Sequence, residues 1–118
     1  MIDKVTEASL LFDFYGNLLS DRKRQVMELY YGEDLSLSEI ADEFQISRSA
    51  VHDSLKSAEK SLEKYEAKLG LMKRFLQRED AIREIEGIIS QLVSEHQGDV
   101  ELKSKLGNIL EVINEIDR

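Results

Sequence analysis

The chain has 118 residues, a formal net charge of −8, and neither cysteine nor proline. This length suits one domain or a small domain with an appendage, and the absence of cysteine excludes disulfide bonds and thiolate chemistry. No apolar run is long enough to cross a membrane, and the first residues lack the basic start and apolar core of a signal peptide. We therefore expect a cytoplasmic protein without a membrane span.

The residue composition favours helix throughout. Proline is absent, and leucine, glutamate, lysine, alanine and isoleucine are frequent. Apolar residues at helical spacing predict a first helix from about Val5 to Leu19. Ser20 can cap a second helix that ends near Gly32. We predict an all-α fold.

The segment Ser36 to Leu55 then has the pattern of a helix-turn-helix. Ser36 and Glu39 have the spacing of a capping box, which opens a short helix. The apolar face of this helix is formed by Ile40, Ala41 and Phe44. Gln45 and Ile46 make the turn, where most such motifs have a glycine because the backbone needs a positive φ; a non-glycine residue costs about 1 kcal/mol there.

The second helix of the motif is predicted to start after Ser47, whose hydroxyl can cap it. Val51 and Leu55 point back to the first helix and leave polar residues, among them Asp53, facing outward. In DNA-binding helix-turn-helix proteins, the outward residues near the start of this helix contact bases and phosphates. Together with a basic triplet before the motif, they give the candidate nucleic-acid-binding residues Arg22, Lys23, Arg24, Ser47, Arg48, Ser49, His52 and Lys56.

Two observations leave the function of this motif open. An ordinary helical hairpin in a bundle would show much of the same pattern. The acidic excess is present both in residues 1–69 and in residues 70–118, whereas a free-standing DNA-binding protein is more often basic. Asp53 would repel a phosphate. Any binding should therefore be weak and strongly salt-dependent.

Beyond the motif, apolar residues recur in steps of four and three. The first stripe runs from Val51 to Leu76 and passes Gly70, which either breaks the helix or is carried inside it at a cost of about 1 kcal/mol. Two further stripes can pair with it or with each other, and a connection with Gly98 and the capping residue Asp99 separates them. These stripes consist of Ile82, Ile85, Ile89 and Leu92, and of Leu102, Leu106, Ile109, Ile113 and Ile116.

The stripes suggest two parts of the chain. We predict a helix-turn-helix head over residues 1–68 and a C-terminal helical region over residues 69–118. The stripes of the C-terminal region either close on one another or on the head, or pair with a second copy to form a homodimer.

Three segments of the chain resemble the YlxM family of small bacterial proteins. They are Leu18 to Tyr31, Asp34 to Ala41 and Ile46 to Val51, with Leu55-Lys56 and the stretch Leu62 to Leu69 adding to the similarity. The head alone is similar to the fourth region of bacterial sigma factors, which reads promoter DNA with a helix-turn-helix.

The resemblance implies two functions. Family members are regarded as DNA-binding proteins whose genes neighbour that of the signal recognition particle GTPase, so an accessory or regulatory role in protein targeting is inferred for them. The first expectation is therefore DNA binding. The alternative is a protein-interaction module that binds the GTPase or the RNA of the particle, for which an acidic surface is suitable.

The sequence shows no pattern of catalytic or cofactor-binding residues. The two histidines, His52 and His96, lie in different segments without a nearby set of metal ligands. There is no glycine-rich phosphate loop, and the serines have no histidine and acid partners in a recognisable pattern. We expect a protein that is not an enzyme and that holds no cofactor and no metal.

Overall fold

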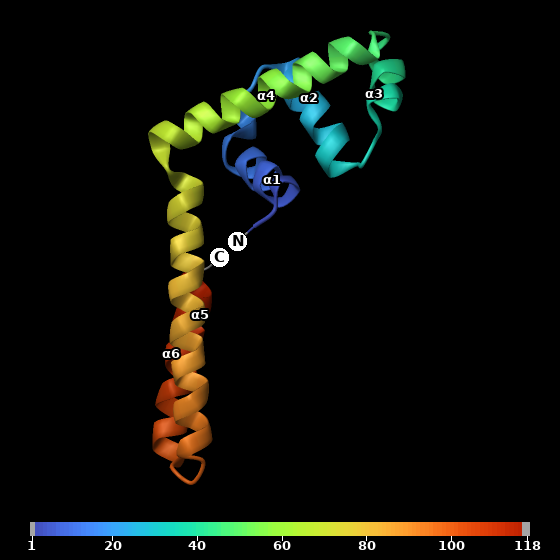
Figure 1. Cartoon of the computed structure of the whole chain (residues 1–118). Helices are drawn as coiled ribbons and strands as arrows, with labels where there is room; N and C mark the ends of the chain where they lie inside the picture. The colour runs from blue at the N-terminus through green and yellow to red at the C-terminus, as the bar shows by residue number, and fades with distance from the viewer. Residues whose placement is uncertain (1, 117–118) are drawn as a thin grey trace. The chain divides into compact units, whose positions relative to one another are not determined.

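The computed structural model describes residues 2–116, which form six α-helices and no strand (Figure 1). The predicted all-α fold is confirmed. The chain divides into two compact units, residues 1–73 and residues 74–118. None of the helices in the described part of the chain is long and apolar enough to span a membrane.

The first unit begins with α1 (Lys4–Tyr15), which is capped by the Asp3 side chain. The helix predicted from Val5 to Leu19 is shorter than expected, because Gly16–Leu18 form a 3₁₀ turn and Leu19 is extended. At Gly16 the chain passes close to the ring of Phe12, where an added Cβ would lie only 2.9 Å from a ring carbon. The α-helix itself therefore ends four residues earlier than the apolar pattern indicated, and the chain leaves the helical course at Leu19.

The next segment starts as the helix α2 (Asp21–Met27) and continues as a π-helical turn over Glu28–Gly32. Its bounds match the predicted start after Ser20 and end near Gly32. Ser20 occupies the N-cap position by its backbone, but its hydroxyl makes no capping hydrogen bond.

The helix-turn-helix consists of α3 (Leu37–Phe44) and the start of α4 (Arg48–Leu69). The predicted capping box is present: Ser36 Oγ accepts from the Glu39 N–H at 3.1 Å, and the Glu39 carboxylate accepts from the Ser36 N–H at 3.1 Å. Gln45 has the predicted positive φ, with φ 56° and ψ 44°. Its own side-chain amide donates to the Asp42 carbonyl at 2.9 Å, which helps to hold this left-handed turn.

The core of the first unit lies where α4 packs against α1, α2 and α3. Val51 and Leu55 are buried as predicted, and the stripe continues with the buried residues Ala58 and Leu62. The other fully buried large side chains of this core are Tyr15, Val26, Met27 and Ile40. The first part of the long apolar stripe is thus buried in the core of this unit.

Gly70 breaks the long helix and so decides between the two alternatives that the sequence left open. It adopts a left-handed conformation with φ 65° and terminates α4, and α5 (Leu71–Glu95) starts directly after it. The Glu66 carboxylate accepts from the N–H groups of Met72 and Lys73, both at 3.0 Å, and the Tyr15 hydroxyl accepts from the Leu71 N–H at 3.0 Å. These acceptors satisfy backbone donors that a new helix leaves free at its first turn.

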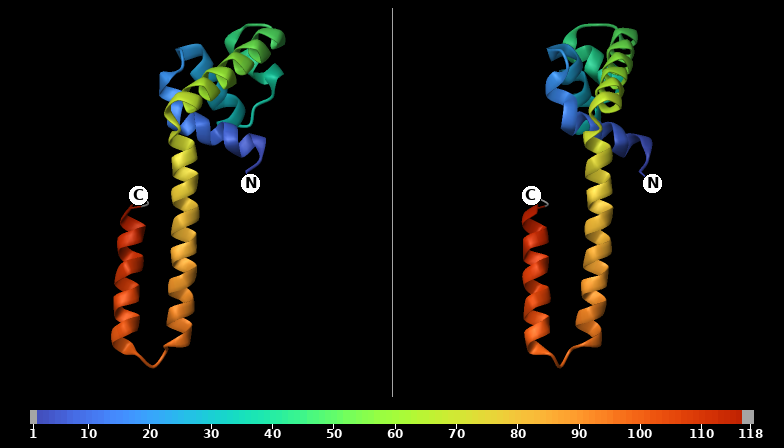
Figure 2. Two further views of the ribbon diagram at one scale, coloured as in Figure 1. Left: turned by 60° about the vertical axis from the view of Figure 1, so that its left-hand side comes forward. Right: turned by 90° about the vertical axis from the view of Figure 1, so that its left-hand side faces the viewer.

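The second unit is an antiparallel hairpin of the remaining part of α5 and of α6 (Val100–Ile116), as both views in Figure 2 show. Asp99 caps α6 as predicted, since its carboxylate accepts from the Leu102 N–H at 3.0 Å. The core contains Ile82, Ile89, Leu106 and Ile113. Ile85, Ile109 and Ile116 of the predicted stripes remain exposed, so the hairpin buries only part of each stripe.

Candidate nucleic-acid interface

The first two turns of α4 carry the candidate residues that the sequence singled out. Arg48, Ser49, His52 and Lys56 are all exposed, whereas Val51 is completely buried and Leu55 nearly so. Residues four apart in a helix are neighbours on its surface, so Arg48, His52 and Lys56 form one continuous ridge. The structure therefore brings these three side chains together on the solvent side of the second helix of the motif.

Ser47 stands at the start of this ridge and has a structural role. Its hydroxyl oxygen accepts from the Ala50 N–H at 3.0 Å and so caps α4. The hydroxyl proton is not used in that bond and remains available to a phosphate or a base. Ser47 can cap the helix and contact a ligand at the same time.

Acidic groups lie beside the ridge. Asp53 Oδ1 is 3.8 Å from His52 Nδ1, and Glu59 Oε2 is 3.6 Å from Lys56 Nζ. Both contacts lie at the surface, where such contacts contribute little, so a polyanion can compete for His52 and for the Lys56 ammonium. The repulsion expected from Asp53 is thus present next to the candidate residues.

The basic triplet on α2 is placed differently from the ridge. The Arg22 guanidinium stacks on the ring of Phe44, 4.6 Å from its centroid, and this contact ties α2 to the end of α3 just before the turn. Arg24 pairs with Asp21 of its own helix at 3.2 Å, and Lys23 is half-buried. Of the three, Arg22 is the exposed cation that contacts the motif itself.

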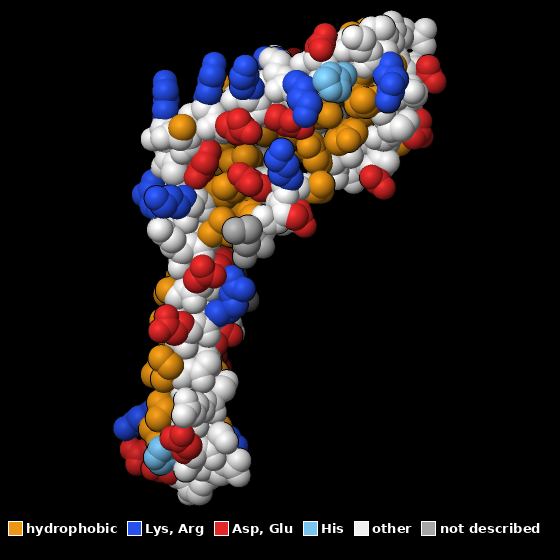
Figure 3. All heavy atoms as spheres, in the orientation of Figure 1, with side chains coloured by type: hydrophobic (Ala, Val, Ile, Leu, Met, Phe, Trp, Pro, Cys, Tyr) orange, Lys and Arg blue, Asp and Glu red, His pale blue; other side chains and the backbone are white. Residues whose placement is uncertain are grey.

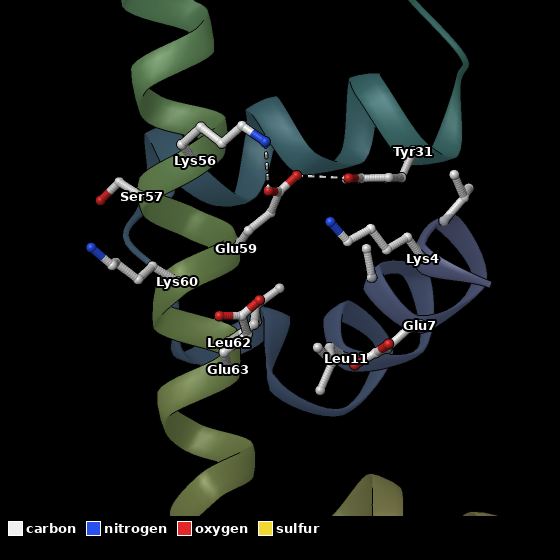
Figure 4. A pocket seen from close by; sticks show the side chains of 12 residues that line it. Lys4, Glu7, Leu11, Tyr31, Lys56, Ser57, Glu59, Lys60, Leu62 and Glu63 are labelled. Carbon is white, nitrogen blue, oxygen red and sulfur yellow. Dashed lines mark hydrogen bonds and ion pairs between the residues drawn. The ribbon is translucent and has the colours of Figure 1, made fainter. Parts of the chain in front are cut away.

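An open cavity of about 850 Å³ lies between α1, the turn Glu28–Gly32 and α4 (Figure 4). The Tyr31 hydroxyl donates to Glu59 at 2.7 Å, and Lys56 approaches the same carboxylate from the other side. Burial, together with the bond to Glu59, raises the pKa of the Tyr31 phenol above its ordinary value. The cavity carries mixed charges and an apolar floor, and no cluster in residues 2–116 could hold a metal ion.

The basic surface of α4 extends beyond the residues predicted from the sequence. The spacing of four continues past Lys56 to Lys60, Lys64 and Lys68, which are exposed. Figure 3 shows lysine and arginine side chains in a row along this helix. The signal was present in the sequence as a repeat of basic residues at every fourth position.

A capped short helix, a left-handed turn residue and a longer second helix with an exposed basic start define this protein as a helix-turn-helix protein. A family model described as UPF0122, "Putative helix-turn-helix protein, YlxM / p13 like", matches residues 2–114. The chain belongs to this family. The resemblance noted in the sequence is confirmed.

Curated relatives agree with this assignment. UPF0122 proteins of Bacillus cereus (strain AH187), Bacillus anthracis (strain A0248) and Bacillus thuringiensis subsp. konkukian (strain 97-27) are each 40% identical over 117 residues. The similarity covers 99% of this chain and 100% of each relative.

Proposed function

We propose that this protein is a binding protein rather than an enzyme, and that it binds duplex DNA through the start of α4. The observation that carries the proposal is the ridge Arg48, His52 and Lys56, which is exposed on a helix anchored from behind by Val51 and Leu55. This is the part of a helix-turn-helix that enters the major groove in DNA-binding members of the class. Ser49 and the Ser47 hydroxyl add short hydrogen-bonding groups at the same end.

The acidity of the chain determines how such binding should behave. Each cation that neutralises a phosphate releases counterions from the DNA. The logarithm of the binding constant therefore falls with the logarithm of the salt concentration, with a slope of about −0.9 for each phosphate contact. A protein of net charge −8 has little long-range attraction to DNA to add to these contacts. We expect weak binding by one copy and a strong dependence on salt.

Fluorescence anisotropy with a labelled random-sequence duplex, at about 50 mM and about 200 mM salt, tests the proposal. Arg48→Ala should weaken binding at least several-fold, whereas Lys103→Ala, an exposed cation of the second unit, should leave it unchanged. Binding that is absent at the lower salt concentration would refute DNA binding.

The family resemblance supports a second candidate, an accessory role in the signal recognition particle pathway. The observation that favours it is the acidic surface, which is complementary to a basic RNA-binding GTPase. The same anisotropy titration with structured RNA, and a pull-down with the GTPase, separate the candidates. Association with the GTPase, together with no binding to the DNA duplex, would favour the accessory role over DNA binding.

We also propose that the second unit pairs with a second copy of the chain. Ile85, Ile88, Ile109 and Val112 are 42%, 53%, 47% and 56% exposed. Ile85 and Ile88 lie beside the buried stripe of α5, and Ile109 and Val112 lie beside the buried stripe of α6. Helical spacing in an antiparallel hairpin places these two pairs on the same face. The hairpin therefore presents one apolar face formed by both helices.

A second copy fits this face for two reasons. A unit of about 45 residues with four core side chains is smaller than most units that are stable with a single hydrophobic core. Units of this size are commonly stabilised by association with another chain. A twofold pairing of identical faces would also complete a four-helix core without requiring any other sequence.

Sedimentation equilibrium of the full chain measures this association. Ile88→Glu should shift the chain toward monomer, while Asn114→Glu, which adds the same charge on the opposite flank, should not. A wild-type chain that stays monomeric at high concentration would contradict the pairing. A dimer would join two weak DNA-binding motifs and raise their combined affinity.

A further inference from the structure

The strongest unexplained feature of the surface is the row of basic side chains on α4. Every fourth residue from the start of the helix is a cation or a histidine, and all are exposed: Arg48, His52, Lys56, Lys60, Lys64 and Lys68. At 1.5 Å per residue the row is about 30 Å long, and each step rises about 6 Å. The DNA-binding proposal uses only its first half.

Two acidic side chains in the second half of α4 bind groups in the body of the first unit, although Glu59 also pairs with Lys56. Glu59 accepts a hydrogen bond from Tyr31, and Glu66 accepts one from Tyr15, each at 2.7 Å. Glu66 also binds backbone N–H groups at the start of α5. Both carboxylates are therefore held against the body of the first unit, and Glu63 is the exposed acid that remains among the three lysines.

The lysines themselves are unengaged in the described structure. Within residues 2–116, Lys56 makes an ion pair with Glu59, but Lys60, Lys64 and Lys68 make none. A lysine ammonium is a mobile point charge that suits phosphate groups and does not distinguish one base from another. Each step of four residues also turns by about 40° around the helix axis, so the three lysines lie within an arc of about 80° that begins next to Lys56 and winds away from Arg48. Three such charges on one winding row are complementary to a phosphodiester backbone, which also follows a curved path.

We propose that Lys60, Lys64 and Lys68 form a phosphate-binding track, which extends the interface from the start of α4 along the backbone of a bound nucleic acid. This inference rests on the proposed function, because the nucleic acid is docked by Arg48, His52 and Lys56. The track contributes affinity and orientation but no sequence preference. It supplies positive contacts that an acidic chain otherwise lacks.

The salt dependence of binding tests the track. The variant Lys60→Gln/Lys64→Gln/Lys68→Gln is compared with Arg83→Gln/Lys103→Gln/Lys105→Gln, which removes the same charge from exposed positions of the second unit. Anisotropy with a random-sequence duplex is measured over a series of salt concentrations. The track variant should reduce the log–log slope by about 2 to 3 and weaken binding at low salt by tenfold or more, while the control keeps the wild-type slope.

The outcomes separate the track from the proposed function. If Arg48→Ala weakens binding and the track variant keeps the wild-type slope and affinity, the track is wrong and the proposed function stands. If the wild-type chain does not bind duplex at low salt, both are wrong. Equal binding of the wild-type chain to poly-L-glutamate, lost in the track variant, would assign the row to acidic proteins and overturn the phosphate assignment.

Discussion

Replacing Val51 by alanine should destabilise the first unit without any direct effect on the binding surface. Val51 is completely buried behind the exposed ridge of α4 and belongs to the core that α4 forms with α1, α2 and α3. Arg48, three residues earlier, is exposed. The two residues therefore test whether α4 has one anchored face and one free face.

The size of the effect follows from the burial. Val51→Ala removes two methyl groups from a fully buried site, at about 0.8 kcal/mol each, and leaves a small cavity, so the free energy of unfolding should fall by about 2 kcal/mol. For a unit of this size that corresponds to a melting temperature lower by about 10 °C. Val51→Asp buries an unpaired charge, costs about 5 kcal/mol and should unfold the unit. Arg48→Ala should change the stability by less than about 0.5 kcal/mol.

Intrinsic fluorescence follows this unit selectively. The chain has no tryptophan, and its four tyrosines, at positions 15, 30, 31 and 65, all lie within residues 1–73. Thermal and urea unfolding monitored by tyrosine emission therefore report on the helix-turn-helix unit and not on the hairpin. If Val51→Ala and Arg48→Ala melted at the same temperature, the assignment of the two faces of α4 would be wrong.

Substitutions at four further positions have defined outcomes. Ser36→Ala removes the α3 cap and should lower the free energy of unfolding by about 1 kcal/mol in urea titrations. The Ser36 N–H lowers the pKa of the Glu39 carboxyl, so the ionised carboxylate stabilises the fold at pH values above the ordinary pKa of glutamate. This contribution to the free energy of unfolding is lost as the pH falls through the pKa of Glu39 in the folded state. The variant Glu39→Gln should therefore lose less stability on acidification than the wild-type chain. Gly70→Ala places a Cβ at φ 65° and should cost about 1 kcal/mol, whereas Gly70→Asn, which tolerates this conformation, should cost less. Burial raises the pKa of the Tyr31 phenol in the folded state. The first unit should therefore lose stability as the pH rises above about 10, where the phenol ionises in the unfolded chain. The variant Tyr31→Phe should lose less stability over the same pH range, as measured by unfolding curves at alkaline pH.

The helix-turn-helix could be predicted in detail because its signals are local. The capping box at Ser36 and Glu39, the cap at Ser47 and the left-handed turn at Gln45 each depend on residues within three positions of one another. The buried face with Val51 follows from helical periodicity alone. Such features are encoded by short-range hydrogen bonds and sterics and do not require knowledge of the rest of the fold.

The break at Gly70 could not be decided in the same way. A glycine costs about 1 kcal/mol inside a helix, which is too little to determine the outcome. The break is accompanied by acceptors from Tyr15, more than fifty residues away, and from Glu66, which bind the first N–H groups of α5. Only the tertiary structure brings the Tyr15 acceptor to that position.

The basic row was missed, and pairing through an exposed hairpin face was left as one of several alternatives, for a different reason. Heptad spacing shows that Ile85 and Ile109 belong to apolar stripes, but it does not show that two helices alone would leave them exposed. Lysines at every fourth position of a helix are usually solvated. The hydrogen bonds that hold Glu59 and Glu66 come from two tyrosines of other segments, and helical spacing alone does not reveal them.

The central claim, that the exposed ridge at the start of α4 binds DNA, is tested most directly by one duplex titration. Anisotropy at about 50 mM salt should show saturable binding by the wild-type chain and clearly weaker binding by the stable variant Arg48→Ala/Lys56→Ala. Equal binding by both proteins, or no binding by either, would contradict the claim.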